Sequence, residues 1–370
     1  LADPPRAGVA DQIALCRKAG IRVVMITGDN GITAASIAQK IGMDNSQRII
    51  TGEMLSQMSD QQLRAQVKET SIFSRVVPEH KMRIVRAFQE NGEIVAMTGD
   101  GVNDAPALKY ADIGIAMGKK GSEVSREAAD LILLDDDFST IVDTVRDGRR
   151  IYDNIRKAVG YVFTIHMPIA LASLLAPMMS IPPEALLLLP LHVVLLELII
   201  DPTCSIVLER QPAERDIMAR PPRNPRQKML TLGLLSKSVL QGLVIFAASF
   251  GMYYLTLAGD SGNAATARTM GLAVIMLANL FLVQVNSSDY DFACQCLRRL
   301  LKDKVMWSVN IGTIVGLLVI VYSPVASFLK LAPLSLGQLA QVVAVAAVAV
   351  LWYELVKAAR KIHARQAHEN

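Results

Sequence analysis

The sequence predicts two parts, an α/β domain with a doubly wound parallel sheet over residues 1–150 and an α-helical membrane domain over residues 151–370. The mean hydropathy is +0.33, which is high for a soluble chain of 370 residues, and the apolar excess lies almost entirely in the second part. The first part alternates short apolar strands with helices, as parallel sheets with helical crossovers do. The second part holds six apolar runs, each near the roughly 20 residues that cross a bilayer.

In the first part, the predicted elements follow one another in a regular order. Helical spacing over residues 8–19 ends at Gly20, and a second helix over residues 31–41 ends at Gly42. A further helix is expected over residues 82–89. The predicted strands are residues 21–26, 71–76, 94–97, 113–117 and 131–134. In an open parallel sheet, the residues that follow such strands gather at one edge, where ligands bind.

Three strands are followed by residues with the chemistry of a metal–phosphate site. The stretch 97–109, MTGDGVNDAPALK, sets Asp100 and Asp104 in a glycine-containing loop, as a hard cation such as Mg²⁺ requires. Thr27 offers a hydroxyl after an earlier strand, and Lys81 offers a point charge after another. Each has a structural alternative: a polar turn, a capped helix start or a surface lysine. Together and in order, they indicate the groups that phosphoryl transfer needs.

Composition excludes several classes of site. The net charge of +4 and the pI of about 8.8 are modest, so we interpret the basic residues as topology signals and not as a nucleic-acid surface. No CxxC pair occurs among the four cysteines, which argues against a structural zinc site or a disulfide framework. Because the chain opens at LADPPR without Met, we expect a piece of a longer or processed protein.

Charge between the apolar runs predicts a topology. The six runs are residues 161–179, 185–207, 232–257, 269–285, 305–322 and 337–356. Basic residues concentrate between the second and third runs, between the fourth and fifth, and after the sixth. By the positive-inside rule, the α/β domain, both basic loops and the C-terminus lie in the cytoplasm. We expect a multi-pass protein of the plasma (cell inner) membrane.

Two carboxylates stand out inside the second run. Glu197 and Asp201, at i and i+4, share one helix face, and a charge at mid-membrane costs about 2.5–3.5 kcal/mol on insertion scales. Pro202 is expected to break that helix and free carbonyl oxygens. Carboxylates with bare carbonyls suit Ca²⁺ or another hard ion. His166, followed by Pro168 in the first run, is either a further ligand or a hydrogen-bonded packing residue.

Several segments resemble the P-type cation ATPases, on the calcium-pump side of that family. They are LADPPR, MITGDN, residues 78–81, TGDGVNDAPALK and EAADLILLDDDFSTIV over residues 127–142. The resemblance covers essentially the whole chain and implies a haloacid-dehalogenase-like phosphorylation domain followed by the last six of ten membrane helices.

The resemblance also implies roles for individual residues. It places Thr27, Gly28 and Lys81 at an aspartyl phosphate, with Asn103 supporting the phosphate site. It places Asp100 at Mg²⁺, gives Asp104 the same supporting role as Asn103, and places Arg6 and Asp29 beside the nucleotide, ATP, and the hinge. Glu197, Asp201 and His166 fall at the transported ion, which is one divalent cation such as Ca²⁺ or, alternatively, protons or monovalent ions.

One departure from the family pattern is as informative as the match. The 370 residues contain no Asp-Lys-Thr-Gly-Thr segment, which carries the phosphorylated aspartate in such pumps. They also lack the actuator domain, the nucleotide domain and four membrane helices of the family pattern. We therefore expect the chain to be inactive alone and to act with an N-terminal half. The alternative is a non-catalytic membrane protein with a remnant or regulatory phosphatase-like domain.

Overall fold

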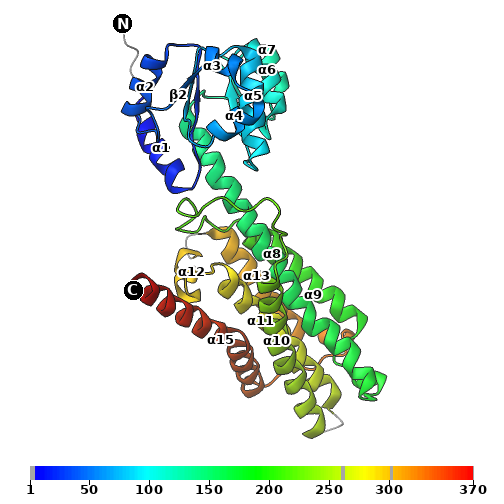
Figure 1. Cartoon of the computed structure of the whole chain (residues 1–370). Helices are drawn as coiled ribbons and strands as arrows, with labels where there is room; N and C mark the ends of the chain where they lie inside the picture. Colours follow the sequence, from blue (N-terminus) through cyan, green and yellow to red (C-terminus); the bar gives the residue numbers. More distant parts are fainter. Residues whose placement is uncertain (1–4, 260–262, 301–302, 370) are drawn as a thin grey trace. The chain divides into compact units, whose positions relative to one another are not determined.

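The computed structural model describes residues 5–259, 263–300 and 303–369 (Figure 1). Within these ranges, it describes the side chains of all residues except 201, 204, 205, 297–300, 363–365 and 367–369. The chain forms two compact units. The first, here called the α/β unit, comprises Leu1–Arg149 and Arg215–Asn224; the second, the helical unit, comprises Arg150–Glu214 and Pro225–Asn370.

Among the described residues, the α/β unit contains two three-stranded sheets, which include the five predicted strands and one further strand, β2. The first sheet has the order β1 (Met25–Ile26), β3 (Ile72–Ser74), β2 (Ile49–Thr51), and the second has the order β4 (Ala96–Gly99), β5 (Ile113–Met117), β6 (Leu131–Leu133). All pairings are parallel. The prediction of a parallel α/β fold is confirmed, but β1 and β4 each pair with a single strand among those described, so one continuous sheet does not form.

Short helices cover these sheets. They are α1 (Val9–Lys18), α2 (Gly31–Lys40), α3 (Gly52–Gln57), α4 (Asp60–Gln66), α5 (Pro78–Glu90), α6 (Ala105–Tyr110) and α7 (Glu123–Ala128). Side-chain caps start several of them: the Asn30 carboxamide oxygen accepts a hydrogen bond from the Ile32 N–H at 3.0 Å, and Ser59 and Gln62 form a capping box. Apolar residues of α5 pack against both sheets, because Ile84 lies in the cluster of Phe73 and Val85 in the cluster of Met97.

Residues 215–224, which the sequence analysis assigned to a membrane loop, fold with the α/β unit. The Arg149 guanidinium donates hydrogen bonds to the carbonyls of Ile217, Arg220 and Ala19, each at 2.8 Å. Gly20 has a φ of +70°, and a Cβ at that position would lie 2.8 Å from the Cδ atom of Pro222. The segment is therefore fitted to the turn that ends α1.

Within the described residues, six helices are long and apolar enough to cross a membrane. The main helices are α8 (Phe138–Met178), α9 (Pro190–Pro202), α10 (Leu232–Gly259), α11 (Ala264–Asn286), α13 (Lys304–Tyr322) and α15 (Leu336–Glu369). Shorter helices are η2 (Pro183–Ala185), η3 (Thr203–Leu208), α12 (Ala293–Leu300) and α14 (Val325–Phe328). Each predicted apolar run coincides with one of the six candidate spans.

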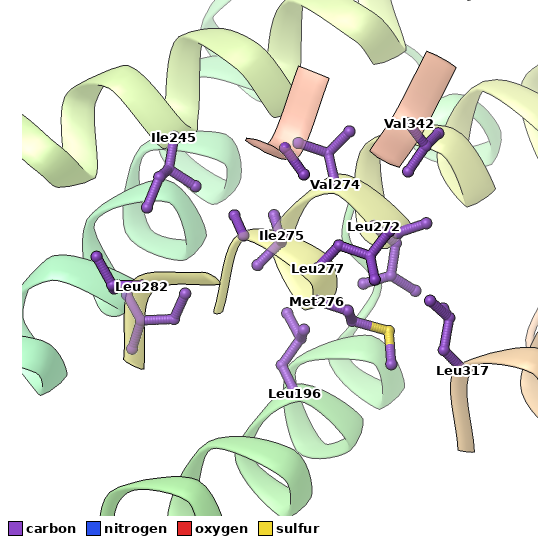
Figure 2. Close-up of a cluster of buried hydrophobic side chains, with 14 of the residues drawn as sticks. Leu196, Ile245, Leu272, Val274, Ile275, Met276, Leu277, Leu282, Leu317 and Val342 are labelled. Atoms are coloured by element: carbon purple, nitrogen blue, oxygen red, sulfur yellow. The ribbon is translucent and has the colours of Figure 1, made fainter. Parts of the chain in front are cut away.

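Helix α11 forms the centre of the helical unit. Its apolar window is 83% buried, whereas the windows of the other five candidate spans are 22–39% buried. Figure 2 shows Leu272, Ile275 and Met276 of α11 in a cluster with side chains from neighbouring helices. Those neighbours include Leu196 of α9 and Leu317 of α13. The apolar surfaces of the other spans are left for lipid or further helices.

The expected break at Pro202 does not occur. Helix α9 continues through Pro202, and the backbone changes to π-helical spacing in η3, from Thr203 onward. Pro202 has no N–H for the carbonyl of Leu198, and the Thr203 N–H donates to the Ile200 carbonyl. The Thr203 hydroxyl also donates to the Ile199 carbonyl at 2.7 Å. Similarly, α8 runs through Pro168.

Candidate functional site

Asp104 is the organising side chain of the loop that follows β4. It ends the short helix η1 (Val102–Asp104), and one of its carboxylate oxygens forms an ion pair with the Lys81 ammonium group. The other oxygen accepts hydrogen bonds from the N–H groups of Asp100, at 3.3 Å, and Gly101, at 3.2 Å. The Asp104 side chain is only 9% exposed. Both of its oxygens are thus engaged by donors of this chain, and they hold Lys81 against the loop.

The backbone of Asp100 is fixed, while its carboxylate is left exposed. The Asp100 carbonyl accepts hydrogen bonds from the Ser122 N–H at 2.7 Å and from the Ser125 hydroxyl at 3.2 Å. Within the described parts of the chain, no residue forms a hydrogen bond or ion pair with the Asp100 carboxylate. A Cβ on Gly99 would lie 2.5 Å from the Cβ of Asp104, so the close approach of loop and strand requires glycine there. An exposed carboxylate on a rigid loop fits a Mg²⁺ ligand.

Thr27 and its two neighbours lie at the end of β1. The Thr27 N–H donates to the Phe73 carbonyl at 2.9 Å, which continues the pairing with β3, and the Thr27 hydroxyl oxygen accepts from the Asp29 N–H at 3.0 Å. Gly28 and Asp29 are exposed. The contacts found for Thr27 are therefore with its own loop and with β3.

The strands that carry Thr27 and Asp100 share part of their core. Ile26, at the end of β1, packs in the same apolar cluster as Met97 of β4 and Val85 of α5. Lys81 lies in the first turn of α5, which follows β3. Of the predicted phosphate-site residues, the structure brings Lys81 and Asp104 into direct contact, and it anchors the strand ends that precede Thr27 and Asp100 in one cluster.

Arg6 and Asn103 occupy different surroundings. The Arg6 guanidinium donates to the Asp136 carbonyl at 2.5 Å, and the Asp136 carboxylate accepts from the N–H groups of Lys119 and Lys120, each at 3.0 Å. These backbone donors outweigh desolvation and lower the pKa of Asp136. Asn103 lies in η1 with its side chain exposed. Arg6 is thus joined to the turn after β6.

His80, beside Lys81, was not identified in the sequence analysis. Its Nε2 atom lies 3.1 Å from the Ser56 hydroxyl oxygen, and its Nδ1 atom accepts from the Val77 N–H at 3.5 Å. Burial, together with the nearby Arg83, lowers the pKa of His80 and keeps the imidazole neutral. The residue secures the first turn of α5 and so the backbone that carries Lys81. Pro78, at the first position of α5, is the sequence signal for that helix start.

In the helical unit, His166 of α8 contacts Glu197 of α9. The Nε2 atom of His166 lies 3.0 Å from an Oε atom of Glu197, and its Nδ1 atom lies 2.8 Å from the Val162 carbonyl oxygen. The two side chains are 44% and 36% exposed. Asp201 follows Glu197 by one turn of α9, but its side chain lies outside the described residues. Two of the three predicted ion ligands are therefore adjacent.

Two buried lysines in this unit were not singled out in the sequence analysis. Lys157 of α8 forms a 2.6 Å ion pair with Glu214, with side chains 9% and 8% exposed, and donates to the Ser287 carbonyl at 2.8 Å. The other Glu214 oxygen accepts from the Ser288 hydroxyl at 2.8 Å. Lys357 of α15 is also buried and donates to the Val285 carbonyl at 2.6 Å. Lys157 thus joins α8 to two loops, and Lys357 joins α15 to the end of α11.

Comparison with known proteins gives two matches to family models. Residues 1–112 match the haloacid dehalogenase-like hydrolase model, and residues 185–359 match the model for the C-terminus of cation transporting ATPases. The calcium-transporting ATPase of Bacillus subtilis is 38% identical over 324 residues, which are 87% of this chain and 36% of that protein. Calcium-transporting ATPase type 2C member 1 of Bos taurus is 34% identical over 325 residues, which are 87% of this chain and 33% of that protein.

A third relative, the endoplasmic reticulum-type calcium-transporting ATPase 4 of Arabidopsis thaliana, is 42% identical over 260 residues, 69% of this chain and 24% of that protein. The chain spans about a third or less of the length of these relatives. Their similarity and the six apolar helices identify a multi-pass membrane protein. The chain belongs to the P-type cation-transporting ATPases, on the calcium-pump side of the family, and it matches their C-terminal portion.

Proposed function

We propose that these residues form part of an ATP-driven cation pump that couples aspartyl-phosphate chemistry to transport across a membrane. The α/β unit would provide the Mg²⁺ and phosphate side of the reaction, and the helical unit would provide the cation path. The observation that carries the proposal is the ion pair of Lys81 with Asp104 beside the exposed Asp100 carboxylate. It occurs in a chain whose relatives are named calcium-transporting ATPases.

On the phosphate side, the residues would have distinct roles. Proteins of this family use ATP and Mg²⁺, and the bound metal neutralises charge on the phosphoryl oxygens. Asp100 would hold Mg²⁺, and Lys81 would balance phosphoryl charge. Thr27 and Gly28 would donate hydrogen bonds to the phosphoryl oxygens. Asp104, predicted as a second metal ligand, has contacts that support a positioning role for Lys81 and the loop.

The remaining predicted residues would act at the edge of this site. Asn103, exposed beside Asp104, would support the phosphate, while Arg6 and Asp29 would lie toward the nucleotide. These assignments rest on the family pattern together with the exposure of all three side chains.

We propose further that the 370 residues do not form a phosphoenzyme by themselves. They contain no Asp-Lys-Thr-Gly-Thr segment, so the nucleophilic aspartate would come from a part of the pump outside them. That part would also bring the actuator domain, the nucleotide domain and four further helices. Two observations support this: the relatives are about three times longer, and β1 and β4 each pair with one described strand.

The cation path would involve Glu197, Asp201 and His166, with Ca²⁺ or another divalent cation as cargo. The contact between His166 and Glu197 supports this, because it brings donors from two candidate spans together. The α/β unit and the C-terminus would face the cytoplasm of a cell whose plasma membrane holds the pump.

The proposal is tested by supplying the missing part. The chain is co-expressed with the N-terminal two-thirds of the Bacillus subtilis relative, and phosphoenzyme is measured with labelled ATP and labelled inorganic phosphate. Phosphoenzyme is expected only when both parts are present. Phosphorylation by ATP should depend on the transported cation, whereas phosphorylation by inorganic phosphate should not. As a control, the relative itself is divided at the same position and its two halves are co-expressed, which establishes that a divided pump assembles.

Two substitutions separate the cation path from the phosphate site. Glu197→Gln and Asp201→Asn should leave phosphorylation by inorganic phosphate intact and remove the cation dependence of phosphorylation by ATP. Unchanged cation dependence would place the transported ion elsewhere. If the control assembles but the chain never supports phosphorylation, the second function, a non-catalytic membrane protein with a regulatory domain, is favoured.

A further inference from the structure

The contact between His166 and Glu197 places a nitrogen donor beside a carboxylate in two membrane-length helices. His166 lies on α8, Glu197 lies on α9, and Nε2 and Oε1 are 3.0 Å apart. The two side chains are 44% and 36% exposed within this chain. The pair is thus less buried than the ion pair of Lys157 with Glu214 in the same unit, whose side chains are 9% and 8% exposed.

The other ring nitrogen determines which hydrogen His166 carries. Nδ1 lies 2.8 Å from the Val162 carbonyl oxygen, and a carbonyl only accepts, so Nδ1 must bear a hydrogen. Nε2 is then the atom that a cation would bind, and a hydrogen held between Nε2 and Glu197 Oε1 would have to leave when it does. Histidines that bind metals are commonly oriented by such a bond from the second nitrogen to a backbone carbonyl. Since Val162 lies one turn earlier in α8, this orientation depends only on the helix itself.

The spacing of the pair also suits a metal ion. Two ligands that each lie about 2.1 Å from a metal are about 3.0 Å apart at the right angle of an octahedral site and about 3.4 Å apart at the tetrahedral angle of zinc. The observed separation of 3.0 Å between Nε2 and Oε1, which is also an ordinary hydrogen-bond distance, would therefore widen by at most about 0.4 Å when both atoms bind one ion.

His192, in the same unit, shows how a histidine with a packing role differs. Its Nδ1 atom accepts from the Leu189 N–H at 3.2 Å, and its Nε2 atom lies 2.8 Å from the Leu329 carbonyl oxygen. Both nitrogens are used by the backbone, and the residue is fully buried. For His166, Nε2 instead faces a carboxylate, which is itself a metal ligand.

We propose that His166 is a specificity-determining residue, whose Nε2 binds the transported cation together with Glu197 and favours first-row transition-metal ions over Ca²⁺. Calcium takes oxygen ligands, whereas imidazole nitrogen suits Zn²⁺, Fe²⁺ and related ions. Replacing one oxygen donor by imidazole raises the affinity for the second class relative to the first. The inference rests on the proposed cation path, but its test is separate.

The test measures Zn²⁺ and Ca²⁺ binding to the full chain in lipid nanodiscs. To remove other zinc ligands, the background carries His363→Gln, His368→Gln and Cys294→Ser. His166→Asn is compared with this background, because the amide keeps a polar group of similar length and offers oxygen. The Zn²⁺ affinity should fall about 10–100-fold, while the Ca²⁺ affinity changes less than about threefold. X-ray absorption at the zinc edge should show imidazole scattering in the background protein and lose it in the variant.

Each outcome decides between the inference and the cation path. If Glu197→Gln weakens both ions but His166→Asn leaves the ratio of Zn²⁺ to Ca²⁺ affinity unchanged, the inference is wrong and the path stands. If zinc binds the background protein without imidazole scattering, the inference is likewise wrong and the cation path stands. If the background binds neither ion, or if Glu197→Gln changes neither affinity, the cation path itself is overturned. The same two variants in the co-expressed pump should shift the cation concentrations that support phosphorylation in the same ratio.

Discussion

The ion pair of Lys81 with Asp104 in the α/β unit and the contact of His166 with Glu197 in the helical unit both join a basic group to a carboxylate. They differ in whether the remaining lone pairs of the carboxylate accept hydrogen bonds from the chain. The Asp104 side chain also accepts two backbone hydrogen bonds and is 9% exposed. Among the described residues, the contact found for the Glu197 side chain is with His166, and the Glu197 side chain is 36% exposed.

The difference separates positioning from binding. A carboxylate whose oxygens are filled by its own chain holds its neighbours in place and gains little from a ligand. A carboxylate with unused lone pairs, such as Asp100 or Glu197, can bind a cation. Substitutions that affect function without affecting stability, or the reverse, test this distinction directly.

The largest effect is expected at Asp100. In the co-expressed pump, Asp100→Asn should lower the rate of phosphoenzyme formation about a thousandfold, because loss of a charged metal ligand removes several kcal/mol at 1.36 kcal/mol per tenfold. The stability of the chain should stay within about 0.5 kcal/mol, since the side chain is exposed. Rapid-quench phosphorylation and thermal unfolding measure the two quantities. Normal phosphoenzyme in this variant would remove Asp100 from the metal site.

The next largest effect is expected at the buried pair in the helical unit. Lys157→Met should destabilise the chain by about 3 kcal/mol, because it leaves the Glu214 carboxylate, 8% exposed, without its counter-charge. Adding Glu214→Leu should recover part of that loss. Chemical unfolding in detergent measures both, and Arg86→Met, which removes an exposed pair with Glu90, should change stability by less than about 1 kcal/mol. An additive double variant would show that the pair is not coupled.

A smaller effect is expected at Asp104. Asp104→Asn removes the charge that holds Lys81. We expect it to lower the local stability of the loop by about 1.5 kcal/mol. The amide hydrogens of Asp100 and Gly101 should then exchange about tenfold faster. Hydrogen-exchange mass spectrometry of the peptide around η1 measures this change. Asp100→Asn is the matched control and should alter the same amides less than about twofold. Equal exchange in both variants would contradict the positioning role.

The smallest effect is expected from pH. Because burial and Arg83 lower the pKa of His80, the folded unit keeps the imidazole neutral where the unfolded chain takes up a proton. The stability that His80 contributes is therefore complete above about pH 6.5, the usual imidazole pKa, and is lost as the pH falls from there toward the lowered pKa. Hydrogen exchange in α5 at pH 7.5 and 5.5 measures the loss. In the His80→Gln variant, the difference in hydrogen exchange between the two pH values should shrink. An unchanged difference would show that another group causes it.

Several features of the fold were predictable because they depend on local pattern. The apolar runs predicted all six candidate spans, and the alternation of strands and helices predicted a parallel α/β fold. Strand β2 was missed, because Ile49–Thr51 is too short to show a period. The predicted span over residues 161–179 is only the last part of α8, because the charged first half of that helix does not resemble a membrane segment.

The candidate site was predictable in residue type but not in the division of labour. The spacing of Asp100 and Asp104 indicated two oxygen ligands, and nothing in the spacing showed that Lys81, 23 residues earlier, occupies one of them. Lys157 resembled an ordinary basic residue of a charged segment, yet it pairs with Glu214, which lies 57 residues away. The assignment of residues 215–224 to the α/β unit likewise depends on Arg149, a contact across about 70 positions.

By itself, the sequence determined which stretches are apolar enough for a membrane, where strands end in polar loops, and which of those loops carry carboxylate, hydroxyl and ammonium groups. These are properties of composition and short-range periodicity. Only the tertiary structure decided which carboxylates are already satisfied by the chain and which remain open. The reason is that the lone pairs of a carboxylate are filled by donors that folding brings from distant positions.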